Sequence, residues 1–160
     1  MTIERFNELV EKHGAKLYRL AYRLTGNMHT AEDMVQDTFK SVWKTKKEIF
    51  KEYEFAFLVK IIKRRIVDMR RLKKFSETNL ENVDGVVEFN YIDNEYSDAV
   101  QKALARLDTS MRETLLLVVV GELTHVEVSE LLKIPVGTVL SRVNRTRKQL
   151  RNLLKEKCII

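Results

Sequence analysis

The stretch "PVGTVLSRVNRTRKQL", Pro135 to Leu150, decides how the second half of this chain folds. In an α-helix over 138–152, neighbouring side chains are about 100° apart, and apolar and polar residues separate onto opposite faces. One face, which suits a core, holds Val139, Val143, Leu150 and Leu153. The other face carries groups able to hydrogen-bond to phosphates or base edges: Thr138, Ser141, Arg142, Arg145, Lys148, Gln149 and Asn152.

A helix-turn-helix explains why this basic helix begins with residues that disfavour a helix interior. Just before it, "THVEVSELL" offers a capping box from Thr124 to Glu127, which predicts a short helix ending at Leu132. A turn and the basic helix then complete the motif. Pro135 and Gly137 would shape the turn and the first positions of the second helix, where a proline's missing N–H does no harm.

The composition indicates a globular protein with an anionic partner. The chain has 160 residues, is 44% hydrophobic and 32% charged, and carries a formal net charge of +6. This length suits one ordinary domain or two small ones, and the charge favours nucleic acid or a membrane surface. No apolar run is long enough to span a membrane, and the N-terminus lacks a signal peptide's apolar segment. We therefore expect a cytoplasmic protein without direct membrane insertion.

The first half of the chain shows three apolar patterns with helical spacing. The first pattern ends at Gly26-Asn27. Its apolar stripe comprises Phe6, Leu9, Val10, His13, Leu17, Leu20, Ala21 and Leu24. A second helix is predicted from Thr30, where "TAED" offers a capping box to Asp33. After a loop, a third helix is predicted from about Phe55 to Lys74. Its expected core residues are Leu58, Ile61, Ile62, Met69 and Leu72.

The chain changes character at Ser76. From Glu77 to Asp98 it has seven acids and no lysine or arginine, and helical periodicity is lost. This pattern is typical of a linker. The predicted fold is therefore all-α, with two small helical domains, 1–75 and 98–157, joined by an acidic flexible linker over 76–97.

The predicted third helix carries a second basic stripe. Six cations project within about 120° of one another on a helical wheel. They are Lys60, Lys63, Arg64, Arg70, Arg71 and Lys74. Arg65 falls on the apolar side, where its charge has no evident partner. Two basic stripes on separate domains suit two contacts along one duplex, although each could also be an ordinary solvated face.

The two halves together resemble a bacterial sigma factor of the extracytoplasmic-function (ECF) group of the sigma-70 family. "AEDMVQDTF" (31–39), "VW" (42–43) and "FLVKIIKRRIVDMRR" (57–71) are similar to region 2 of that family. Residues 103–150, which end in "GTVLSRVNRTRKQL", are similar to region 4. The signatures AED-x-x-Q-D-x-F and GTV-x-SR-x-x-R-x-R occur here in the family's order and separation.

The resemblance implies a function and partners. Such proteins bind core RNA polymerase, direct it to specific promoters and initiate transcription there. Region 2 contacts the −10 element and the β′ coiled coil, whereas region 4 reads the −35 element and packs on the β flap. An anti-sigma factor, often membrane-bound, is a common further partner. In region 2, the loop over 47–55 would help to form a pocket for a flipped promoter base.

The resemblance also assigns residues to each interface. The implied polymerase-binding residues are Asp33, Gln36, Asp37 and Lys40. The implied −10 residues are the cations of the third helix: Lys60, Lys63, Arg64, Arg70, Arg71 and Lys74. The implied −35 residues are Thr138, Ser141, Arg142, Asn144, Arg145 and Lys148. The chain departs from the family's usual "LP" at Leu107-Asp108 and from its usual glycine at Lys133.

Two other functional classes fit the sequence less well. A helix-turn-helix regulator that does not bind core polymerase would explain the C-terminal half, but the region 2 signature argues against it. An enzyme would need a catalytic constellation, yet the histidines are scattered and nucleophile or phosphate-loop motifs are missing. The pair His29-x-x-Glu32 lacks further metal ligands, and Cys158 is the only cysteine. We therefore expect no enzymatic activity, no metal and no cofactor.

Overall fold

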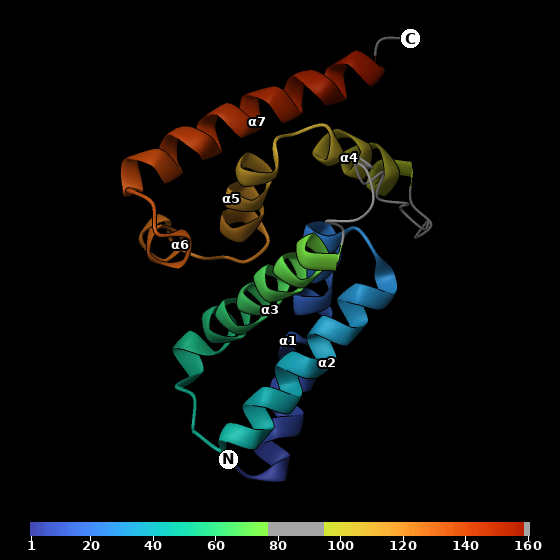
Figure 1. Cartoon of the computed structure of the whole chain (residues 1–160). Coiled ribbons are helices and arrows are strands. Elements are labelled where there is room, and N and C mark those ends of the chain that lie inside the picture. The colour runs from blue at the N-terminus through green and yellow to red at the C-terminus, as the bar shows by residue number, and fades with distance from the viewer. Residues whose placement is uncertain (77–94, 159–160) are drawn as a thin grey trace. The chain divides into compact units, whose positions relative to one another are not determined.

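The computed structural model describes residues 1–76 and 95–158, and every element in those ranges is a helix. These helices form two compact units, α1 to α3 and α4 to α7 (Figure 1). The all-α class and the division into two helical domains are confirmed. The predicted linker lies almost entirely outside the described residues, because only Ser76, which ends α3, and 95–97, which begin α4, are described.

In the first unit, α1 (Ile3–Thr25) begins and ends where its capping residues dictate. The Thr2 side chain accepts a hydrogen bond from the Arg5 amide, and Gly26 follows the helix in the left-handed region with φ 68°. Glycine adopts this conformation without a steric cost. The helix buries much of the predicted stripe, with Leu17, Leu20 and Ala21 fully enclosed.

The second helix, α2 (Met28–Thr45), begins earlier than the sequence predicted. The side chain of Asn27 accepts a hydrogen bond from the Thr30 amide at 2.9 Å and so acts as the N-cap. The predicted capping box between Thr30 and Asp33 is therefore wrong, because Thr30 already lies inside the first turn. The helix buries Ala31, Thr38, Phe39 and Val42.

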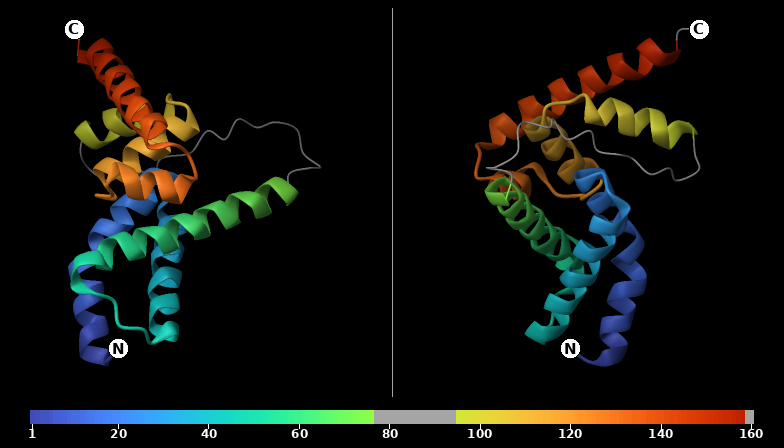
Figure 2. Two further views of the ribbon diagram at one scale, coloured as in Figure 1. Left: turned by 90° about the vertical axis from the view of Figure 1, so that its left-hand side faces the viewer. Right: turned by 45° about the vertical axis from the view of Figure 1, so that its right-hand side comes forward.

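A short 3-10 turn, η1 (Lys51–Tyr53), leads into α3 (Glu54–Ser76), which packs across α1 and α2. Its fully buried side chains include Leu58, Ile62 and Ile66. The predicted burial of Leu72 is wrong, because its side chain is 71% exposed. The last turns of α3 extend past α1 and α2 (Figure 2), so these two helices do not cover this part of the apolar stripe.

The second unit is organised around its long last helix, α7 (Val136–Cys158). Three shorter helices pack against it: α4 (Glu95–Ala105), α5 (Thr109–Val119) and α6 (His125–Leu132). The core between them holds Leu104, Leu107, Leu115, Leu116, Leu117, Val128, Val139 and Val143. The predicted boundaries of the short helix are confirmed.

The turns of the second unit account for two departures from the family pattern. Asp108, where the family usually has proline, caps α5 by accepting hydrogen bonds from the amides of Ser110 and Met111. Lys133 lies in the left-handed region with φ 55° and ψ 46°, which explains the family's glycine at this turn. The capping box from Thr124 to Glu127 is confirmed in both directions.

The start of α7 differs from the prediction. The Pro135 carbonyl accepts hydrogen bonds from the amides of Thr138 and Val139, so the proline stands just before the helix. Gly137 lies within the first helical turn and does not have a positive φ, so it does not shape the turn.

Candidate nucleic-acid and polymerase interfaces

The helix α7 presents most of the predicted −35 residues to solvent. Ser141, Asn144, Arg145 and Lys148 are exposed, whereas Thr138 and Arg142 are half-buried. On the opposite side Val139 and Val143 are buried. This face therefore combines hydrogen-bonding groups with cations that could hold phosphates.

A buried threonine fixes the rotation of α7 against the rest of the unit. Thr146 is fully buried, and its hydroxyl lies 2.6 Å from the Arg142 carbonyl and 3.5 Å from the Met111 carbonyl in α5. Because the side chain points into the core, the neighbouring Arg145 and Arg147 point outward. Sequence reasoning did not single out Thr146, since a threonine among cations resembles another surface residue.

The hydrogen bonds of the α5 cap shift the ionisation of Asp108. The pKa of the Asp108 carboxyl lies below its usual value, first because the Ser110 hydroxyl donates a hydrogen bond to it. The Met111 amide also contributes, and the positive charge of Arg142 adds to the effect.

On α3, the structure brings only part of the predicted basic stripe to the surface. Lys60, Arg64, Arg71 and Lys74 are exposed. The prediction that Lys63 belongs to the solvent-facing stripe is wrong, because Lys63 is only 5% exposed. Lys63 lies one helical turn after the buried Val59, and so at the edge of the α3 face that packs on the core. Arg70 is half-buried and donates a hydrogen bond to the Leu24 carbonyl at 3.2 Å.

Arg65, whose position the sequence left unexplained, connects α3 to α2. One terminal nitrogen donates a hydrogen bond to the Ser41 hydroxyl, and the other lies 3.5 Å from a carboxylate oxygen of Asp37. Asp37 also lies 3.6 Å from Lys40. The Arg65 guanidinium therefore lies beside polar side chains of α2, at the edge of the core.

The predicted polymerase face of α2 divides into exposed and engaged residues. Asp33, Gln36 and Lys40 are exposed. Asp37 is half-buried and paired with Arg65. Asp33 does not cap α2, because Asn27 does so. Asp33 is therefore a better position than Asp37 for testing this face without disturbing the fold.

An apolar groove between α1 and α2 borders this face. Its lining includes Gln36 and Lys40 together with apolar side chains. The apolar lining comprises Ile3, Phe6, Val10, Val35, Phe39 and Trp43. The Phe6 ring meets the Phe39 ring edge-on at 6.2 Å and lies 5.1 Å from the Trp43 ring. Trp43 remains 39% exposed and Ile3 60% exposed.

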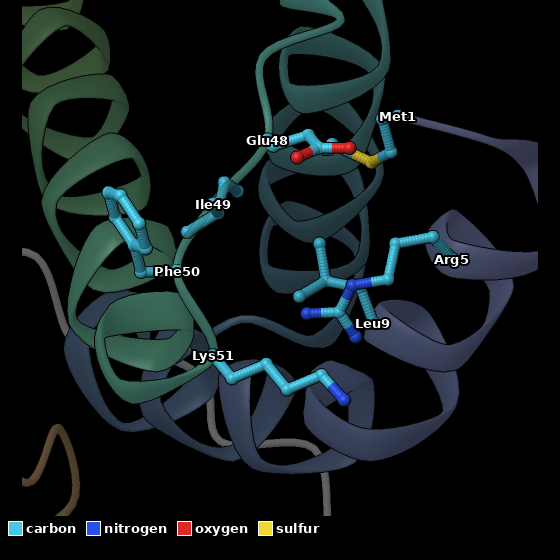
Figure 3. Close-up of a pocket in the computed structure, with 7 residues that line it drawn as sticks. All are labelled: Met1, Arg5, Leu9, Glu48, Ile49, Phe50 and Lys51. Carbon is cyan, nitrogen blue, oxygen red and sulfur yellow. The ribbon is translucent and has the colours of Figure 1, made fainter.

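The loop between α2 and α3 leaves aromatic side chains in solvent. Phe50 is 80% and Tyr53 59% exposed. A cavity of about 280 Å³ lies beneath this loop and is lined by Met1, Arg5, Leu9, Glu48, Ile49, Phe50 and Lys51. Figure 3 shows Phe50 directed away from Arg5. Phe55, where the sequence predicted the end of this loop and the start of the third helix, belongs to α3 and stacks on His13 at 5.6 Å.

The first residue of α3 is a buried carboxylate that sequence reasoning missed. Glu54 is 1% exposed. Arg5 and Lys12 of α1 form ion pairs with it, the second at 3.1 Å. His13 lies 2.9 Å from it and is packed in the core, as its place on the stripe predicted. The cluster anchors the end of the exposed loop to α1.

Comparison with known families now identifies the chain. The model of sigma-70 region 2 matches residues 9–75, and the model of sigma-70 region 4 matches residues 97–150. The chain belongs to the sigma-70 family. The region 2 match supports a sigma factor over a helix-turn-helix regulator that does not bind polymerase.

Named relatives place this sigma factor in the ECF group. The ECF RNA polymerase sigma factor SigW of Bacillus subtilis is 28% identical, over 96% of this chain and 90% of SigW. The ECF sigma factor SigE of Mycolicibacterium smegmatis is 34% identical, over 93% of this chain and 61% of SigE. The protein is an ECF sigma factor, which directs core RNA polymerase to promoters and initiates transcription.

Two solved structures share the fold. The sigma factor RpoE of Bartonella quintana, in complex with the anti-sigma factor NepR, has a TM-score of 0.74 and 22% identity, over 96% of this chain and 98% of RpoE. CnrH, in complex with the cytosolic domain of CnrY, has a TM-score of 0.61 and 24% identity, over 97% of this chain and 90% of CnrH.

The described residues provide neither a membrane span nor a metal centre. None of the helices in 1–76 and 95–158 combines the length and apolarity that crossing a bilayer requires. In the same ranges, histidine, cysteine and carboxylate side chains do not gather into a group of three that could hold a metal.

Proposed function

We propose that this sigma factor uses three separate surfaces: the exposed face of α2 for core polymerase, α3 with its preceding loop for the −10 element, and α7 for the −35 element. The observation that carries the proposal is that most of the motif residues on α2 and α7 are exposed, while the opposite face of each helix is buried. Charged and amide side chains turned to solvent on a well-packed helix are available to partners.

The α2 surface suits a helical partner. A helix can insert an apolar side chain into the groove beside Phe39 and Trp43, while its polar residues meet Asp33, Gln36 and Lys40 at the rim. The β′ coiled coil would supply such helices. Asp37 would act indirectly, because its pairing with Arg65 fixes α3 beside α2.

The −10 surface would combine phosphate contacts with base stacking. Lys60, Arg64, Arg71 and Lys74 are the exposed cations for the backbone. Phe50 and Tyr53 offer exposed rings on which unpaired bases can stack. Lys63 and Arg70, which the protein itself engages, are assigned to the fold.

The −35 surface would be the N-terminal half of α7. Ser141, Asn144 and Arg145 can reach base edges, and Lys148 can hold a phosphate. Arg142, which is half-buried, would lie at the edge of this surface.

An anti-sigma factor is proposed as a further partner, because RpoE of Bartonella quintana was solved with NepR. The apolar groove on α2 is where such a partner would compete with polymerase. We place the protein in the cytoplasm, where polymerase and promoters are found, and assign it no catalytic activity of its own.

The exchange Asp33→Lys tests the polymerase surface. It should weaken binding to core polymerase from the source organism by about tenfold or more, because a charge at an interface rim is reversed. The helical circular dichroism should not change, since Asp33 is exposed and is not the N-cap. Asp68→Lys, an equivalent reversal at an exposed position of α3, is the control and should bind core normally. Equal affinity of Asp33→Lys and wild type would remove α2 from the interface.

A further inference from the structure

The first turns of α7 expose two apolar side chains that no packing in the unit explains. Leu140 is 43% exposed and Val136 37% exposed. They are four residues apart and so lie on one side of the helix. Leu140 directly follows Val139, which is fully buried, and is therefore rotated by about 100° from the core face.

The surroundings of Leu140 point to a polyanion as its partner. Continuing along the same side of α7, the spacing i+4, i+7 and i+11 reaches Asn144, Arg147 and Arg151, all exposed. Ser141, also exposed, is its immediate neighbour. A protein partner or a lipid surface would favour a longer apolar stripe. A short apolar contact followed by an amide and two guanidinium groups suits a DNA groove, with bases at one end and phosphates at the other.

Gly137 supports the same conclusion. A Cβ built on it would meet nothing within 4 Å, and the residue does not have a positive φ. Neither packing nor backbone conformation therefore requires a glycine, although glycine weakens a helix. A missing side chain between Val136 and Ser141 lets an outside molecule approach the backbone closely.

We propose that Leu140, with Val136 beside it, reads the C5-methyl group of a thymine in the −35 element. This inference rests on the proposed function, in which α7 lies in the major groove. The N-terminal residues of a recognition helix contact base edges there. The thymine methyl is the one apolar group on those edges, and apolar side chains are its partners. Leu140 thereby becomes a specificity-determining residue beyond the hydrogen-bonding residues of the family motif.

Deoxyuridine tests this directly, because it keeps the hydrogen-bonding groups of thymine and lacks only the methyl. Holoenzyme made from the full chain and core polymerase is bound to a promoter that it transcribes. Each −35 thymine, on either strand, is replaced in turn by deoxyuridine. Wild-type affinity should fall about fourfold at one position, as expected for one buried methyl group. Leu140→Ala should bind the thymine duplex about fourfold more weakly and show no further loss with deoxyuridine.

The control is Val119→Ala, which truncates another exposed apolar residue of the same unit, outside α7. It should retain the thymine dependence. The proposal is overturned if wild type is insensitive to deoxyuridine at every thymine, or if Leu140→Ala is weakened yet keeps the full deoxyuridine effect. The latter result would place Leu140 against polymerase. If wild-type holoenzyme instead showed no base preference anywhere in the −35 element, α7 would not be the part that reads it. The proposed function of that surface would then fail as well.

Discussion

Glu54 and His13 are hydrogen-bonded at 2.9 Å across 41 residues of sequence, with the carboxylate completely enclosed. Arg5 and Lys12 approach the same carboxylate, so the first turn of α3 is bound to the first half of α1. A buried carboxylate without its cations would be costly. The loop with Phe50 and Tyr53 ends at this anchor, and its position therefore depends on it.

Glu54→Gln should destabilise the first unit by about 1.5–3 kcal/mol, the range for hydrogen bonds to charged groups. Trp43, the single tryptophan, lies in α2 and reports urea unfolding of this unit by fluorescence. Glu8→Gln is the control, because Glu8 also pairs with Arg5 but its side chain is 65% exposed. It should change stability by less than about 1 kcal/mol. Similar losses for both variants would show that the burial of Glu54 has no special effect.

The ionisation of Asp108 should make the stability of α5 depend on pH. Its pKa in the folded chain is lowered from 3.8 by the Ser110 hydroxyl, the Met111 and Ser110 amides and the charge of Arg142. The stabilisation is therefore fully present above the ordinary pKa and is lost as the pH falls through the folded value. Asp108→Asn keeps a capping side chain but cannot ionise.

Hydrogen exchange of the α5 amides, measured between about pH 6 and 3, checks this expectation. The wild type should be better protected near pH 6, and the gap to Asp108→Asn should shrink as the pH falls below 3.8. A gap that stays constant over this range would mean that the carboxylate charge does not stabilise the cap.

Arg145 should contact a base of the −35 element, whereas Lys148 should contact a phosphate. Both are exposed and lie one turn apart on α7. A guanidinium can pair with two acceptors on guanine, whereas an ammonium serves as a point charge on phosphate. Arg145→Ala should cost about 1–3 kcal/mol on the preferred −35 sequence and relax discrimination at one base position. Lys148→Ala should weaken binding about equally across sequences and reduce the salt dependence by roughly one counterion.

Holoenzyme binding to single-base −35 variants at two salt concentrations separates the two roles. A uniform loss for Arg145→Ala, with every base preference retained, would make Arg145 a phosphate contact.

Local patterns in the sequence predicted the helices well. The apolar stripes locate α1 and α7, and the box at Thr124 identifies the start of α6. Such signals involve residues within one or two turns of each other, and they need no knowledge of the partner helix. The wrong prediction of a capping box at Thr30 has the same origin. Asn27, which can also cap a helix, lies three positions earlier, and its side chain accepts the capping hydrogen bond.

Features that depend on contacts between helices could not be predicted. A helical wheel places Lys63 on the border of two faces, and only the position of the neighbouring helices shows that it is buried. It places Leu72 on the apolar face without showing that α3 extends past its partners. The burial of Glu54 and the pairing of Arg65 with Asp37 join residues distant in sequence. The site residues on α2 came from the family motif, and those on α7 came from helical spacing and the motif together. The structure adds which of them are exposed.

Reconstituted transcription tests the central claim most directly. Core polymerase from the source organism, purified free of other sigma factors, is combined with this chain on fragmented genomic DNA, and transcript 5′ ends are mapped. The account predicts new start sites that share −35 and −10 elements at a constant spacing, and Asp33→Lys should abolish most of them at limiting protein. The same core preparation, active with another sigma factor but without promoter-specific initiation by this chain on any fragment, would contradict the account.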